Sequence, residues 1–95
     1  MPTKLEDAQR IKDEAEQTHE RMVDFARFAR ETERNIKLCD AELSKLSEND
    51  PKRRVFIETR IRLQRSLERD RKMVEVGRLL LESSAVIIES IEDGA

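Results

Sequence analysis

The sequence predicts an all-α protein of two long antiparallel helices, a coiled-coil-like helical hairpin. Three observations favour this fold class. Two Gly and two Pro among 95 residues leave too few turn signals for a β-rich fold. Apolar residues recur at alternating steps of three and four, as in helices that pack side by side. One strong helix break lies near the middle, at residues 47–51. We therefore expect a single helical-hairpin domain over residues 1–95.

The composition limits the size of the hydrophobic core and indicates the cellular compartment of the protein. Charged residues make up 42% of the chain, and Trp and Tyr are absent, so a thick globular core is not expected. Met1–Arg10 carries acidic residues where a secretory signal would be apolar, and the longest uncharged run, Ser83–Ile88, is too short to span a membrane. The single cysteine cannot form an intrachain disulfide. These features predict a cytoplasmic protein with no membrane partner.

The first helix is expected over residues 4–48. Thr3 and Glu6 have the spacing of a capping box, in which each side chain bonds the backbone N–H of the other residue. From there a stripe of apolar and small residues follows a strict alternation of steps of three and four, and we call such a stripe a seam. Half of its positions are Ala or Thr or similarly small, so its partner must approach closely. The seam comprises Ala8, Ile11, Ala15, Thr18, Met22, Phe25, Ala29, Thr32, Ile36, Cys39, Leu43 and Leu46.

The break predicts a short loop at residues 49–50 and a second helix over residues 51–92. Asn49 is suited to end a helix in the left-handed conformation. Asp50 is a good N-cap, and Pro51 occupies the first helical position, where proline is accepted. A turn at this place makes residue i of the first helix face residue 99 minus i of the second, so Met22 is expected to lie over Gly77.

The end of the second helix carries two seams, whereas the first helix offers only one narrow stripe to cover them. Val74, Gly77, Leu81, Ser84, Ile88 and Ile91 are expected to face the first helix. A second seam lies about a third of a turn away, and leaving its large side chains exposed would forgo roughly 1.5–3 kcal/mol each. We therefore predict that two hairpins dimerise into a four-helix bundle, or that a helix of another protein binds here. The predicted oligomer interface is Met73, Val76, Leu80, Ser83, Ile87 and Ile91.

The predicted interface favours a non-enzymatic function. We expect a small helical protein that mediates protein–protein interaction or oligomerisation. We expect it to act as an adaptor, a small chaperone or a secretion-associated hairpin, with itself or another helical protein as partner. No phosphate-binding loop, nucleophile elbow or zinc spacing is visible in the sequence. We accordingly expect no catalytic residue, no cofactor, no metal and no small-molecule substrate.

An RNA-binding dimer is the alternative. Between Lys52 and Lys72 the chain has nine basic and three acidic residues. Four of the basic residues share the face opposite the seam, as phosphate contacts on structured RNA would require. A solvated face, or one paired within the molecule, is the competing interpretation. The row comprises Arg62, Arg65, Arg69 and Lys72.

Glu16, His19, Cys39 and Asp70 are further candidates for a functional role, and each can also be explained as an ordinary structural residue. Glu16 and His19 match the Glu-x-x-His spacing of metal-binding bundles, and with Glu82 of a dimer they form a remote metal-site alternative. Cys39 falls on the seam, where cysteine behaves as a small hydrophobe. Asp70 falls on the second helix's seam, where pairing with Arg27 or Arg30 would set the register, unless it is solvated at the seam's edge.

The turn at Asp50-Pro51 and the apolar end at Ala85–Ile88 resemble the helical hairpins of type III secretion needle subunits and their small chaperones. The charged fraction of 42% departs from the polar, small-residue composition of needle subunits. The architecture also resembles a plasmid RNA-binding helical-hairpin dimer, with which the chain shares no motif. No family is assigned on these grounds, and no functional residue is carried over.

Overall fold

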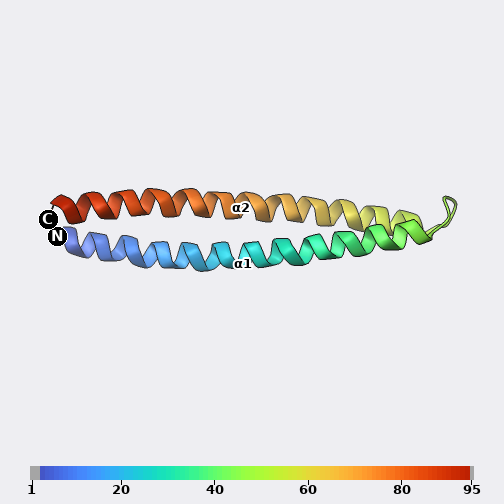
Figure 1. Cartoon of the computed structure of the whole chain (residues 1–95), viewed down its shortest axis with the longest axis horizontal. Helices are drawn as coiled ribbons and strands as arrows, with labels where there is room; N and C mark the ends of the chain where they lie inside the picture. The colour runs from blue at the N-terminus through green and yellow to red at the C-terminus, as the bar shows by residue number, and fades with distance from the viewer. Residues whose placement is uncertain (1–2, 95) are drawn as a thin grey trace. The chain divides into compact units, whose positions relative to one another are not determined.

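The chain folds as two long helices that form a hairpin (Figure 1). A computed structural model describes residues 3–94, and this range contains no strand. Helix α1 spans Lys4–Lys45 and helix α2 spans Lys52–Gly94. The expected all-α hairpin is thereby confirmed. Residues 1, 2 and 95 of the expected domain lie outside the described range.

The helix starts follow the expected capping chemistry. The Thr3 hydroxyl accepts a hydrogen bond from the Glu6 N–H at 3.1 Å, and the Thr3 N–H donates to Glu6 Oε2 at 3.3 Å, which is the reciprocal capping box. The carboxylate of Asp50 accepts from the Lys52 N–H at 2.9 Å and caps α2. Both caps satisfy amide groups that the first turn of a helix leaves without intrahelical partners.

The turn differs from its expected form. Helix α1 ends at Lys45, and the Asp50 N–H donates to the Ser47 carbonyl at 3.1 Å in a turn that follows it. No described residue has a positive φ, so the expected left-handed Asn49 is wrong. Arg53 supplies another way to end the helix, because its Nη1 donates to the carbonyls of Leu43 at 3.1 Å and Leu46 at 3.4 Å. A guanidinium from α2 thus satisfies carbonyls that α1 leaves free.

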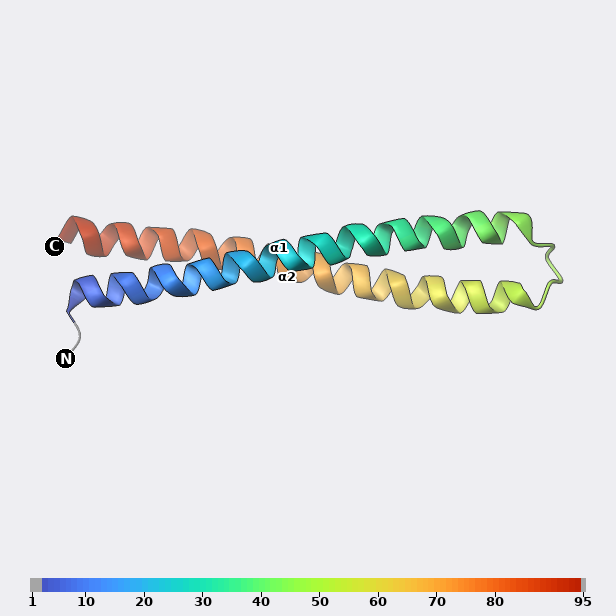
Figure 2. The ribbon, with the colours of Figure 1, turned by 90° about the horizontal axis from the view of Figure 1, so that it is seen from below.

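The contacts of the chain fall into two compact units, which we describe separately. The terminal unit comprises residues 1–24 and 73–95, and the turn unit comprises Phe25–Lys72. In each unit a segment of α1 runs antiparallel to a segment of α2, as Figure 2 shows from another side.

The turn unit holds the main apolar cluster. Ala29, Ile36 and Leu67 are buried together, and Leu63 packs against them. Leu67 is the most deeply buried of these, with 3% of its surface exposed. Arg60 contacts Asp40 through Nε and Oδ1 at 2.6 Å, and Arg71 pairs with Glu33. The two ion pairs tie α1 to α2 beside the cluster.

The seam of the first helix and the α2 residues expected to face it are covered. Every residue of the first helix's seam is buried or half-buried, and so are Val74, Gly77, Leu81, Ser84, Ile88 and Ile91 of α2. The structure adds Arg53 and Arg60, which are half-buried and extend the alternation of three and four backward from Leu63. Sequence reasoning missed them because it sought apolar residues at these positions. A long arginine side chain can cover apolar surface with its methylene groups and still use its guanidinium at the edge.

In the terminal unit the two helices lie close together at Gly77. A Cβ placed on Gly77 would lie 3.2 Å from Met22 Cβ and 3.3 Å from Met22 Cγ. The expected pairing of Met22 with Gly77 is therefore confirmed. Lys12 Nζ also contacts Glu92 Oε1 at 2.5 Å across the same unit.

We expect Gly77→Leu to destabilise the protein by about 1–3 kcal/mol, because the new side chain must displace Met22 in a close contact. Replacement of Met22 by alanine in the same chain should restore part of the loss. Urea unfolding followed by circular dichroism measures both. Gly94→Leu is the matched control, since a Cβ there meets no atom within 4 Å. Equal stability of Gly77→Leu and the wild type would contradict the close contact.

Candidate interaction surface

The second seam of α2 lies on the surface of the terminal unit. Met73, Val76, Leu80, Ser83 and Ile87 are all exposed, and Leu80 has 52% of its surface accessible. Ile91, the sixth residue of the predicted interface, is half-buried and continues the covered seam three residues after Ile88. The chain itself therefore covers one seam of α2 and leaves the other accessible.

Two more apolar side chains widen this surface. Leu79 and Val86 are exposed, and each directly precedes a residue of the second seam. At 100° per residue, the whole set falls within about 140° of the helix circumference. A search for a wide arc rather than for steps of three and four would have found both. We call this set the outward apolar face: Met73, Val76, Leu79, Leu80, Ser83, Val86 and Ile87.

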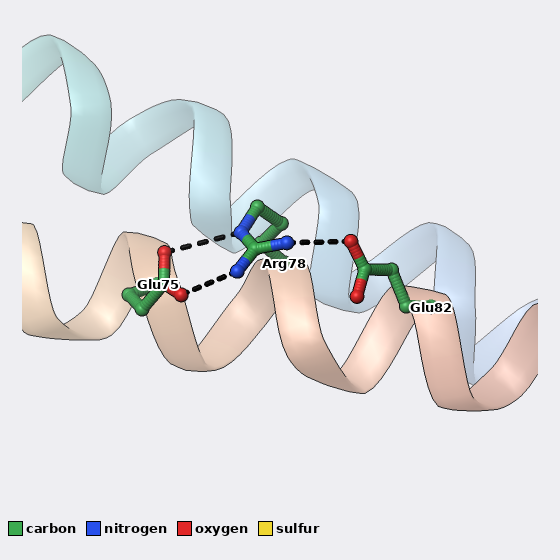
Figure 3. A network of polar contacts seen from close by, with 3 residues as sticks. All are labelled: Glu75, Arg78 and Glu82. Atoms are coloured by element: carbon green, nitrogen blue, oxygen red, sulfur yellow. Dashed lines mark hydrogen bonds and ion pairs between the residues drawn. The ribbon is translucent and has the colours of Figure 1, made fainter.

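A network of charged residues borders the outward apolar face. Arg78 donates from Nε and Nη2 to Glu75 at 3.1 and 2.5 Å, and from Nη1 to Glu82 at 2.5 Å (Figure 3). These residues are three and four positions apart on α2, a spacing that places side chains next to each other. The hydrogen bond from Arg78 lowers the pKa of Glu75, and the bond to Glu75 raises the pKa of Arg78.

We expect Arg78→Gln to raise the pKa of Glu75 toward the ordinary value of a glutamate. The folded pKa is lowered, so the stabilisation from this pair is present above the ordinary pKa and is lost as pH falls through the lowered one. Carbon-detected NMR titration of the Glu75 carboxyl group measures the change. Arg54→Gln is the control, because Arg54 pairs with Glu58 and should leave the Glu75 titration unaltered.

The predicted basic row lies in the turn unit and is exposed at all four positions. Neighbouring cations are paired: Arg54 with Glu58, Arg60 with Asp40 and Arg71 with Glu33. None of the four row residues has an ion pair or side-chain hydrogen bond within residues 3–94. Pairing within the molecule, one of the two competing interpretations, thus finds no support among the described residues.

Glu16, His19 and Cys39 belong neither to the outward apolar face nor to the basic row. Glu16 and His19 are exposed and line a hollow of about 570 Å³ in the terminal unit, together with Gln9, Lys12, Asp13, Ala15, Leu81 and Ile88. Within residues 3–94, no group of three or more His, Cys, Asp or Glu side chains is placed to hold a metal ion. Cys39 is a buried free thiol on the seam.

Asp70 is buried in the seam, with 7% of its surface exposed. Residues 3–94 provide no hydrogen bond or ion pair to its carboxylate, and the expected pairing with Arg27 or Arg30 is not formed. No side-chain oxygen or nitrogen in this range is both fully enclosed and without a hydrogen-bond partner. The carboxylate oxygens of Asp70 are therefore not completely enclosed, although the residue is buried.

The comparisons with known proteins add no family. No family model matches the chain, and neither a curated protein nor a solved structure matches it. Among residues 3–94, neither helix combines the length and the apolar character needed to cross a membrane.

Proposed function

We propose that the protein is a non-enzymatic interaction module that binds another copy of itself, or another helical protein, through the outward apolar face. The observation that carries this proposal is the contrast within α2, where the seam facing α1 is covered and the adjacent seam is exposed. A helix that is apolar on two sides gains stability when a second helix covers the other side. An apolar patch with a charged border is also typical of a protein-binding surface.

Self-association is the simplest form of this function. Two copies that pack through this face would place four helix segments together in a coiled-coil-like, four-helix bundle. Such a module would serve as an adaptor or small chaperone. The proposal includes no catalytic step, and it places the chain in the cytoplasm, since the single buried thiol of Cys39 has no disulfide role.

Sedimentation equilibrium of the purified protein tests this function. A single chain has a mass of 11.2 kDa, and we expect the average mass to rise toward a multiple of that value as concentration increases. Apolar contacts between helices should make the associated form more resistant to heat at higher concentration. A mass that stays at 11.2 kDa up to high micromolar concentration, together with no helical partner in a pull-down from the native source, would overturn the proposal.

Binding of structured RNA is the second candidate, and it is favoured by the basic row, which has no ion pair within residues 3–94. Each phosphate contact releases a counterion, so Arg65→Ala and Arg69→Ala should each lower the slope of log affinity against log salt by about one. Arg54→Ala is the control, because that side chain is engaged with Glu58. Absence of binding to structured RNA at low salt would remove this candidate.

A further inference from the structure

The two units carry opposite charge. The terminal unit has five basic and twelve acidic residues, a formal net charge of −7. The turn unit has fourteen basic and nine acidic residues, a formal net charge of +5. The net charge of −2 for the whole chain conceals this division. A surface on one unit therefore attracts the other unit of a second copy and repels its own equivalent.

Acidic residues border the outward apolar face, and basic residues form the row on the turn unit. Glu75, Glu82 and Glu89 follow one another at steps of seven, along the border of the outward apolar face. Glu75 and Glu82 share the single cation of Arg78, so the border keeps a negative excess. In the turn unit, the basic row has no carboxylate partner among residues 3–94, and its cations are available to another molecule.

Apolar side chains beside the basic row could pack against the outward apolar face. Val55 and Ile61 are exposed in the turn unit, and at 100° per residue they lie on either side of the basic row. The methylene groups of arginine and lysine cover apolar surface while their charged groups reach to its edge. The basic row extends over the eleven residues 62–72, about 15 Å from end to end, and the outward apolar face over the fifteen residues 73–87, about 21 Å. The row thus fits within the length of the face.

We propose that the outward apolar face of one copy docks on the basic row of the turn unit of a second copy. This inference rests on the proposed self-association and specifies its partner surface. The apolar face receives the arginine stems together with Val55 and Ile61, and the guanidinium groups bind the glutamates at the border. The contact joins two different surfaces, so a reciprocal pair closes as a dimer, whereas single contacts continue into longer chains. Contact between two terminal units would instead bring together two charges of −7.

Two charge-reversal variants test the pairing by sedimentation. The row variant carries Arg62→Glu, Arg65→Glu and Arg69→Glu, and the border variant carries Glu82→Lys and Glu89→Lys. Each variant alone is expected to be monomeric at concentrations where the wild type associates. An equimolar mixture should recover the associated mass, because the reversed charges are again opposite. Unchanged association of each variant alone would overturn the docking.

Salt dependence of the unaltered protein gives an independent readout that does not depend on the folding of a variant. The screening length falls from about 10 Å at 0.1 M salt to about 3 Å at 1 M, so we expect association to weaken at least about tenfold over this range. Tighter association at 1 M would indicate contact between like-charged terminal units and overturn the docking while the proposed function stands. A wild-type monomer would overturn both. Association that disappears after nuclease treatment would show that RNA occupies the basic row.

Discussion

Replacement of Leu80 by glutamate is expected to convert the associating protein into a monomer. Leu80 lies at the centre of the outward apolar face, with 52% of its surface exposed in the single chain. Its coverage by a partner contributes roughly 1.5–3 kcal/mol. A glutamate at the same place must lose water without gaining a cation, because the guanidinium groups of the docked row bind the glutamates at the border of the face. We expect the association constant to fall by at least about 100-fold.

Val23→Glu is the matched control for this experiment. Val23 belongs to the same unit and is exposed to a similar degree, 48%. Val23 shares its side of α1 with Gln9 and Glu16, which precede it at steps of seven and line the hollow. Val23 is therefore not part of the outward apolar face, which lies on α2. Sedimentation of both variants, with helicity checked by circular dichroism, separates loss of the contact from loss of the fold. Equal association of Leu80→Glu and the wild type would exclude this face as the interface.

The largest loss of stability is expected from Leu67→Ala. Leu67 is 3% exposed and belongs to the cluster with Ala29 and Ile36, so truncation removes buried methyl groups and leaves a cavity. Such substitutions cost about 2–5 kcal/mol. Proteins of this size have a total stability of about 5–15 kcal/mol, so the loss is a large fraction of the whole. Urea unfolding at several protein concentrations measures it and separates folding from association.

Leu38→Ala tests whether burial causes that loss. Leu38 is the same residue type in the same unit, but 60% of its surface is exposed. Its truncation should change the free energy of unfolding by no more than about 0.5 kcal/mol. If the two variants proved equally stable, the cluster around Leu67 would not be the core of the turn unit.

Much of the fold could be predicted because it depends on local patterns. The capping box at Thr3 and Glu6, the cap at Asp50 and the alternation along each helix are properties of short stretches of chain. One turn then sets the register, which is why Met22 could be placed over Gly77 before any contact was known. The accessible second seam followed from the same comparison of apolar residues on the two helices.

Which charged side chains contact one another could not be predicted from the helical periodicity of the sequence. The sequence by itself determined two helices, their register and an apolar seam that one helix cannot cover. Only the tertiary structure decided that Arg53 closes the end of α1, that Arg60 enters the seam and that the basic row finds no carboxylate among residues 3–94. The physical reason is that helical periodicity assigns each residue to a side of its own helix. Which charged groups then meet depends on long, flexible side chains from segments that are distant in the sequence.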